Sequence, residues 1–168
     1  MLHARLPRTE GAVRLGFVLA DGRTSIAALR QSGAASARFP RSTIGDFPEA
    51  VLLNTAGGLT GGDRIDIEVA VAAGCNATIT SAAAEKVYRA LDGEAEVHVR
   101  LDVGEGARLA WLPQPTIMFD RARLHRRTEV AISGSSSFLA VERLIFGRSA
   151  MGEDVHRGAC RDSWRVRR

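Results

Sequence analysis

Hydrophobic and polar residues alternate along two segments in the middle of the chain, 64–71 and 96–103. A period of two over such a length is typical of a half-buried β-strand, because successive side chains of a strand point to opposite faces. Both segments are therefore predicted to be strands. Their apolar positions are Ile65, Ile67, Val69 and Val71 in the first, and Val97, Val99, Leu101 and Val103 in the second.

The N-terminal part of the chain predicts a hairpin. Residues 12–20 and 25–30 are expected to be strands, joined by a turn at Asp21 and Gly22, a dipeptide typical of tight hairpin turns. The small and polar residues 31–37 are expected to form a connection. Residues 39–48 begin and end with Phe-Pro and predict a loop or short turn, because proline interrupts regular structure.

A glycine-rich loop then separates two predicted strands. The strand at 49–54 enters the loop 55–62, which contains Gly57, Gly58, Gly61 and Gly62. Gly57 and Gly62 have the spacing of a phosphate-binding P-loop, but Asp63 and Arg64 follow where that motif needs Lys and Ser or Thr. A strand also follows, where a P-loop leads into a helix. The loop is therefore interpreted as a tight β-arch or hairpin loop, and these glycines shape it.

Three segments share a pattern of strand, glycine turn and strand. Gly74, Gly104 and Gly134 recur every 30 residues, each flanked by apolar residues at similar offsets. A fixed period of this size indicates stacked units that bury their faces against one another. The sequence thus predicts a mainly β, layered, β-helix-like fold, that is, a β-solenoid. An antiparallel β-sandwich is the alternative, since three weak copies can also arise by chance.

The last apolar run, 138–146, is interrupted only by Glu142 and Arg143. It is predicted to be a strand buried on both faces. A carboxylate in such a strand is costly unless it is paired or coordinates a metal ion. Both a buried Glu–Arg pair and a metal contact remain open for Glu142.

Composition narrows the class of protein. The 168 residues are 45% hydrophobic, which suits one domain with a sizeable core. The formal net charge is +4, and Lys86 is the only lysine, so a pI near 10 reflects arginine. A basic nucleic-acid-binding β-protein is therefore the alternative function. The arginines are interleaved with 19 acidic residues, however, and the densest cluster near the C-terminus is interpreted as a solvated tail.

The sequence gives little support for other classes of protein. Cys75 and Cys160 lie far apart and match neither a disulfide framework nor a zinc motif. The four histidines are isolated, and no catalytic motif is found, so an enzyme is not expected. The N-terminus lacks an apolar stretch of signal-peptide length, and no segment is long enough to span a membrane. A cytoplasmic protein without membrane association is predicted.

Four ordered motifs resemble the family of the urease accessory protein UreD, also called UreH. They cover roughly residues 54–153. Four motifs in the same order are more specific evidence than any one of them. In chain order they are Asn-Thr-Ala-Gly-Gly-Leu-Thr-Gly-Gly-Asp at 54–63, Ala-Glu-Lys-Val-Tyr-Arg at 84–89, Leu-Pro-Gln-Pro-Thr-Ile-Met-Phe at 112–119, and Gly-Arg-Ser-Ala-Met-Gly-Glu at 147–153. Position 115 departs from the pattern, because Pro115 stands where many members carry Glu.

The resemblance implies a coil-like, two-layer β-fold with few short helices, and a non-enzymatic role. Members of the family are scaffolds that bind apo-urease, through its structural subunits, and the partners UreF and UreG. The complex helps to insert nickel into the urease active site, and UreG hydrolyses GTP. Members extend past the position of Arg168, so the resemblance implies a single UreD-like domain over residues 1–168 that is incomplete at its C-terminus.

The resemblance also implies an internal nickel route without a tightly bound cofactor. Nickel(II) in transit needs exchangeable ligands, and carboxylates with water suit this better than a thiolate cage. The acids in or beside the motifs are therefore the candidate nickel contacts, with Glu142 first because its strand is otherwise apolar. For Asp63, a bond to the backbone of the glycine loop is an equal alternative. The candidates are Glu142, Asp63, Asp120 and Glu153.

Overall fold

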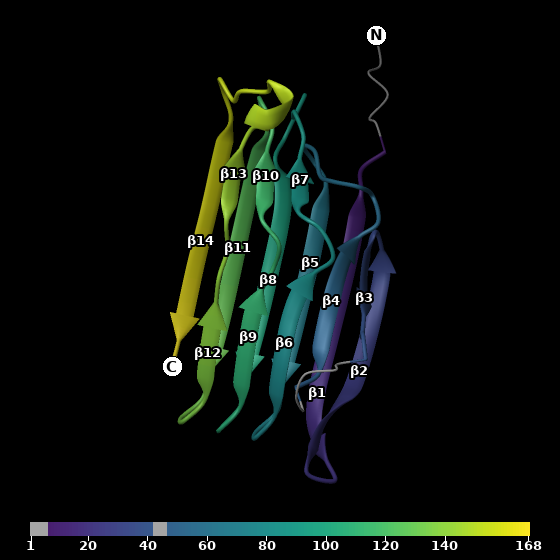
Figure 1. Cartoon of the computed structure of the whole chain (residues 1–168), viewed down its shortest axis with the longest axis vertical. Helices are drawn as coiled ribbons and strands as arrows, with labels where there is room; N and C mark the ends of the chain where they lie inside the picture. The colour runs from purple at the N-terminus through teal and green to yellow at the C-terminus, as the bar shows by residue number, and fades with distance from the viewer. Residues whose placement is uncertain (1–6, 42–46) are drawn as a thin grey trace.

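The chain winds into a β-solenoid (Figure 1). The longest dimension of the molecule runs along the strands. The computed structural model describes residues 7–41 and 47–168. Three successive coils share one order: a long strand, a tight turn, a shorter strand and a three-residue strand. They are β5 (Arg64–Val71), β6 (Asn76–Ser81) and β7 (Glu85–Val87); β8 (Ala95–Val103), β9 (Arg108–Leu112) and β10 (Thr116–Met118); and β11 (Arg123–Ile132), β12 (Ser137–Ala140) and β13 (Leu144–Phe146).

Other elements precede and follow these coils. The N-terminal strands are β1 (Glu10–Ala20), β2 (Arg23–Gly33), β3 (Ala35–Arg38) and β4 (Glu49–Asn54). After β13 come the 3-10 helix η1 (Ser149–Met151) and the strand β14 (Ala159–Arg167). In the described part of the chain, no helix has the length and apolar character that a membrane crossing requires.

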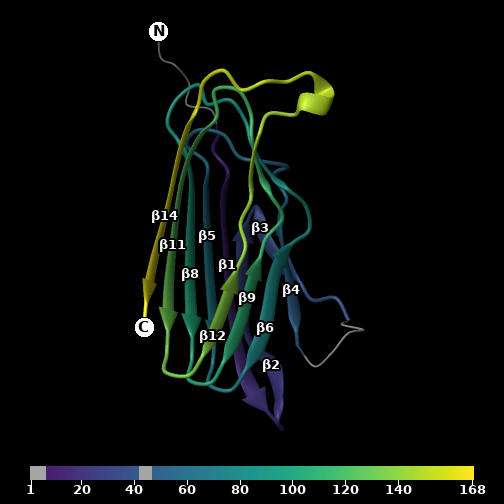
Figure 2. The same ribbon diagram turned by 60° about the vertical axis from the view of Figure 1, so that its left-hand side comes forward.

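Equivalent strands of successive coils form three sheets (Figures 1 and 2). Sheet A has the order β14-β11-β8-β5-β1-β2, sheet B the order β12-β9-β6-β4-β3, and sheet C the order β13-β10-β7. Neighbours are parallel except β1 with β2 and β3 with β4. The structure therefore confirms the predicted β-solenoid and not the alternative, an antiparallel β-sandwich.

The stacking of the three repeats is confirmed, but the predicted 30-residue register is wrong. Arg64 pairs with Glu96, and Ala95 pairs with Leu124, so successive coils are offset by 32 and then by 29 residues. The turn residues equivalent to Gly74 are therefore Gly106 and Ser135. Most of the difference arises where the chain returns from sheet C to sheet A: seven residues join β7 to β8, but only four join β10 to β11.

Alternation places one face of each long strand in the core. Leu15, Val69, Leu101 and Val130 occupy the same position on four adjacent strands, and each is at most 2% exposed. The predicted strands at 64–71 and 96–103 are thus confirmed, together with their buried faces. The hairpin turn is confirmed as well, since Asp21 and Gly22 have φ values of 50° and 74°.

Two predicted segments differ from the structure. Residues 31–37 are not a connection, because β2 continues to Gly33 and β3 begins at Ala35. Gly33 makes this close succession possible: its φ is 58°, and a Cβ there would lie 2.0 Å from the Glu10 carbonyl oxygen. Within the predicted loop 39–48, residues 42–46 lie outside the described residues.

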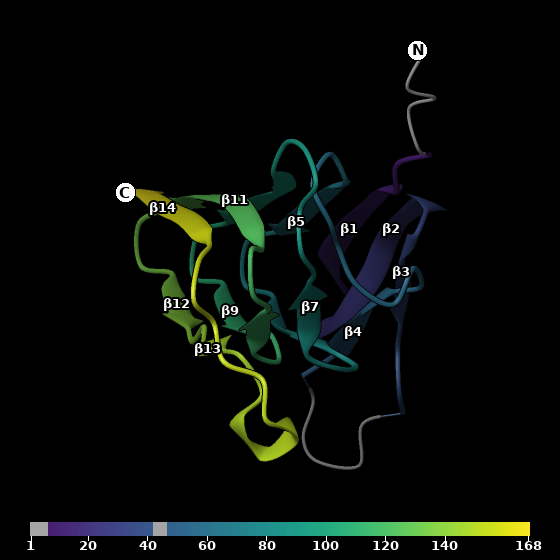
Figure 3. The same cartoon turned by 90° about the horizontal axis from the view of Figure 1, so that it is seen from above.

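The segment 138–146 is not one buried strand. It divides into β12 and β13, because the chain passes here from sheet B to sheet C. Leu139 is 57% exposed and Phe146 is 63% exposed, since no further coil of the described chain covers this end. Figure 3, a view from above, shows β12, β13 and β14 together at one side of the molecule.

Candidate functional site

A partly open cavity of about 310 Å³ lies between the three sheets. Its walls are mostly apolar and include Leu52, Leu59, Val97 and Trp111. Small residues line one side, namely Ala82, Ala83, Ala84, Gly57 and Gly58. Polar side chains are a minority of the lining, and they determine what the cavity can bind.

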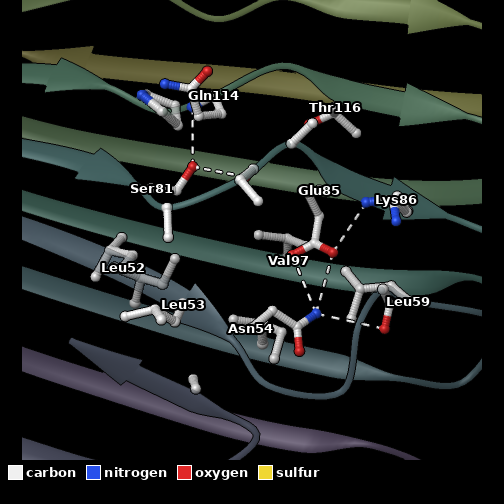
Figure 4. Close-up of a pocket in the computed structure, with 18 of the residues that line it drawn as sticks. Leu52, Leu53, Asn54, Leu59, Ser81, Glu85, Lys86, Val97, Gln114 and Thr116 are labelled. Carbon is white, nitrogen blue, oxygen red and sulfur yellow. Dashed lines mark hydrogen bonds between the residues drawn. The ribbon is translucent and has the colours of Figure 1, made fainter. Parts of the chain in front are cut away.

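The first polar group in the cavity is formed by Asn54 at the end of β4 and Glu85 at the start of β7 (Figure 4). The Asn54 amide donates to both carboxylate oxygens of Glu85, at 3.1 and 3.2 Å. The Lys86 backbone N–H also donates to this carboxylate at 3.2 Å. Burial raises the pKa of Glu85, and these hydrogen bonds only partly oppose the rise.

The second group is an ion cluster around Arg126, which points inward from β11. Its guanidinium lies 2.8 Å from Glu142 Oε2, donates to Asp162 Oδ2, and donates to Thr116 Oγ1 at 3.3 Å. Burial acts to lower the pKa of Arg126, but the hydrogen bond to Asp162 and the charge of Glu142 raise it overall. The arginine therefore keeps its charge in a largely apolar environment.

Glu142 lies in the segment between β12 and β13, and two side chains contact its carboxylate. Trp111 Nε1 donates to Glu142 Oε1 at 3.0 Å, and Arg126 lies beside Oε2. The Arg126 contact is a charge contact without hydrogen-bond geometry, so the buried Oε2 atom accepts no hydrogen bond from the described residues. The interpretation of Glu142 as part of a buried Glu–Arg pair is confirmed, and the partner is Arg126.

The other three predicted nickel contacts lie outside the cavity lining. Asp63 is 4% exposed and accepts the N–H groups of Thr9 and Thr60, each at 2.8 Å, so it holds the glycine loop. This matches the alternative given for it from the sequence. Asp120 accepts the backbone N–H groups of His156 and Arg157, which lower its pKa.

Glu153 completes the predicted set. It forms an ion pair with Arg148 at 2.8 Å, at the edge of the segment that contains η1. The structure therefore does not bring the four acids together. Within residues 7–41 and 47–168, no group of three or more His, Cys, Asp or Glu side chains is placed to hold a metal ion.

Of the two predicted alternatives, an arch or a hairpin loop, the glycine loop is an arch, because β4 lies in sheet B and β5 in sheet A. Leu59 in the loop forms a parallel bridge with Val87 of β7, so the loop occupies the sheet C position one turn before the first of the three coils. Gly57, Gly58 and Gly62 have positive φ values of 78°, 146° and 87°. Gly58 is also packed against Tyr88, whose ring would lie 2.4 Å from an added Cβ.

The model of the UreD urease accessory protein family matches residues 9–168. The chain belongs to the UreD family. It is 52% identical over 164 residues to the urease accessory protein UreD of Rhizobium etli, covering 98% of this chain and 60% of the relative. For the proteins of the same name from Mesorhizobium japonicum and Bradyrhizobium diazoefficiens, identity is 51% and 48%, over 95% and 96% of this chain and 57% and 58% of the relative. The chain thus spans about 60% of the length of these curated relatives.

Two cavity residues of this UreD family member were not predicted as site residues. Glu85 lies within the motif 84–89, but its strand is only three residues long and gives no periodicity to mark it. For Arg126, the sequence does contain a signal. This residue occupies an inward position in the alternation of Leu124, Arg126, Thr128 and Val130, so a charge stands on a face that is otherwise buried.

The Glu85→Gln variant is expected to change how stability depends on pH. The pKa of Glu85 is raised in the folded state, so its contribution to stability is fully present below the unfolded-state pKa, about 4.3, and is lost as pH rises through the folded-state pKa. The free energy of unfolding of the wild type, relative to the variant, should therefore fall as pH increases from 4 to 7. Urea unfolding followed by circular dichroism at several pH values measures this.

Glu105→Gln is the matched control with the opposite sign. Ser135 donates to the exposed Glu105 carboxylate through its backbone N–H and its hydroxyl, and both bonds lower the pKa of Glu105. Its contribution is present above the unfolded-state pKa and is lost as pH falls through the folded-state value. If both variants followed the same pH trend, the assignment for Glu85 would be wrong.

Proposed function

We propose that this chain is a non-catalytic scaffold in urease maturation, and that nickel(II) passes through the cavity between its three sheets on the way to apo-urease. Membership of the UreD family supports the accessory role. The observation that carries the nickel route is Glu142, a carboxylate in the cavity wall with one buried oxygen that accepts no hydrogen bond from the described residues. The Arg126 guanidinium lies 2.8 Å from this oxygen, so a nickel ion would bind there by displacing the guanidinium.

The chemistry of the cavity suits a cargo that must leave again. Glu85 and Glu142 supply oxygen ligands, which bind nickel(II) more weakly than thiolates do. The positive charge of Arg126 beside Glu142 weakens the attraction further. Water would complete the coordination shell of the ion, and the polar side chains Ser81, Gln114 and Thr116 lie along the same lining. Asp63, Asp120 and Glu153 stay predictions as nickel contacts.

The proposed partners are UreF, UreG and the urease structural subunits. Because the chain spans about 60% of its relatives' length, binding of each partner has to be tested on this chain itself. Co-expression of the tagged chain with UreF, UreG and apo-urease, followed by affinity purification, is the direct test. Retention of UreF or urease subunits is expected. Soluble, intact chain that retains none of them would contradict the scaffold role.

Glu142→Gln is expected to weaken nickel binding by roughly tenfold, since removal of a carboxylate charge from a metal site typically costs at least this much. Glu85→Gln should have a similar effect. Isothermal titration calorimetry with nickel(II) measures the affinity, and activation of co-expressed urease measures delivery. Glu105→Gln is the matched control, because Glu105 is exposed, accepts hydrogen bonds from Ser135 and does not line the cavity. Equal losses in all three variants, or in none, would contradict the route.

The alternative of nucleic-acid binding receives less support from the surface. On the outer face of sheet A, arginines pair with acids, as in Arg14 with Glu68 at 2.7 Å and Arg64 with Asp66 at 2.8 Å. A face of alternating sign lacks the uniform positive potential that attracts a phosphate backbone. Strongly salt-dependent retention of the chain on DNA would revive this alternative.

A further inference from the structure

Arg126 contacts its two carboxylates in different ways. Its Nε and Nη2 atoms both donate to Asp162 Oδ2, and the distance from Nε is 3.2 Å. Nη1 donates to Thr116 Oγ1 at 3.3 Å. Toward Glu142 Oε2, in contrast, the guanidinium has a charge contact of 2.8 Å that lacks hydrogen-bond geometry. Asp162 and Thr116 therefore fix the position of the guanidinium, and Glu142 only lies beside it.

Glu142 has a hydrogen bond that does not involve the guanidinium. Trp111 Nε1 donates to Oε1 at 3.0 Å, whereas the buried Oε2 accepts no hydrogen bond from the described residues. The side chain of Glu142 also lines the cavity. Loss of the contact with Arg126 would therefore leave the carboxylate held at one oxygen, with the lone pairs of the other oxygen available to a cation in the cavity.

The three charges of this cluster do not cancel. One guanidinium meets the carboxylates of Asp162 and Glu142, so in their ionised forms one negative charge is in excess. The side chains of Arg126 and Glu142 are only 8% and 11% exposed, and charges interact more strongly in such surroundings than in water. The excess carboxylate attracts a cation, and the guanidinium beside it repels the same cation. The balance between the two depends on how firmly Asp162 holds Arg126.

Arg126 can give up one of these contacts while it retains the others. A guanidinium carries five N–H donors in a planar arrangement, and here Nε, Nη1 and Nη2 all donate to Asp162 or Thr116. Of these two anchors Asp162 is the stronger, because a hydrogen bond between charged groups is stronger than one to a neutral hydroxyl. A shift of the guanidinium away from Glu142 therefore loses a charge contact but no hydrogen bond.

We propose that Asp162 is a positioning residue for cation binding at Glu142. Asp162 retains the Arg126 guanidinium while a divalent cation takes the place beside Glu142 Oε2. When the guanidinium returns to this place, its positive charge drives the cation away, so the binding stays reversible. For the identity of the cation, nickel(II), this inference rests on the proposed function. It adds the two residues that decide how tightly the cation is bound.

Isothermal titration calorimetry of the whole chain with nickel(II) tests this role. Asp162→Asn should weaken binding roughly tenfold, because Arg126 then has Glu142 as its one carboxylate partner among the described residues. Adding Arg126→Met to this variant should reverse the loss and make binding tighter than in the wild type, since the competing charge is gone. Asp102→Asn, in an exposed pair with Arg100, is the matched control for net charge and should leave the affinity unchanged. Circular dichroism checks that each variant is folded.

A different role of Asp162 predicts different results. If Asp162 were itself a nickel ligand, Asp162→Asn would weaken binding whether or not Arg126 is present, and the proposal would be overturned. Equal affinities of the wild type and Asp162→Asn, or an equal loss in Asp102→Asn, would overturn it too. In these cases a loss of binding in Glu142→Gln would show that the nickel route itself stands. A wild-type chain that binds no nickel(II) would contradict the route and this proposal together.

Discussion

Replacing Arg126 with methionine is expected to lower the free energy of unfolding by about 3–5 kcal/mol at pH 7, the usual cost of leaving a buried charge without its partner. Arg126 is 7% exposed and contacts both Glu142 and Asp162. Without it, two carboxylates would face each other with no positive charge between them. Methionine keeps most of the side-chain volume, so the loss reports charge and not packing. Guanidinium unfolding followed by circular dichroism measures it.

Two further variants separate this effect from a general loss of arginine. Arg14→Met removes a guanidinium from an exposed pair whose side chains are 57% and 45% exposed, and it should cost less than about 1 kcal/mol. The double variant Arg126→Met, Glu142→Leu should regain part of the stability, because an apolar replacement of a buried ion pair is often tolerated. An Arg126→Met variant no less stable than Arg14→Met would show that the cluster is unimportant for folding.

The sequence predicted the kind of fold because each long strand carries its own alternation. Ile65, Val69 and Val71 on β5 mark an inner face without knowledge of any neighbour. The register between coils could not be obtained in this way. It depends on the lengths of the loops that join sheet C to the next long strand, and the spacing of Gly74, Gly104 and Gly134 does not report those lengths.

The candidate site was predicted only in part, for a related reason. Glu142 stood out because a carboxylate interrupts an apolar run, but its partner Arg126 lies on another strand of the same coil and is brought near only by the path of the chain. Asp63 lies in a motif segment and Asp120 directly follows one, and yet both accept backbone N–H groups at loops. A motif identifies important residues, but it does not tell whether they stabilise the fold or bind a ligand.

Gly61→Ala is expected to be the most damaging single change in the glycine loop, at about 3 kcal/mol, the upper range for overpacking in a well-packed region. Gly61 is buried, and an added Cβ would lie 2.0 Å from the Asp92 carbonyl oxygen and 3.0 Å from the Ala90 Cβ. The opposing atoms include backbone, so no side chain can rotate away. The segment 90–94 would have to move, which would also strain the bond from Gly62 N–H to the Glu94 carbonyl, 2.8 Å in the native chain.

Gly57→Ala is the matched control in the same loop. Gly57 has a φ of 78°, but a Cβ there would meet nothing within 4 Å, so its cost should be the conformational one of about 1 kcal/mol. Urea unfolding of both variants should therefore give a difference of about 2 kcal/mol between them, the clash at Gly61 being the added term. Equal costs would mean that the loop needs glycine for its backbone angles alone. A larger cost at Gly61 would instead show that the arch is held closed by contact with segment 90–94, which fixes the wall of the cavity at Gly57 and Gly58.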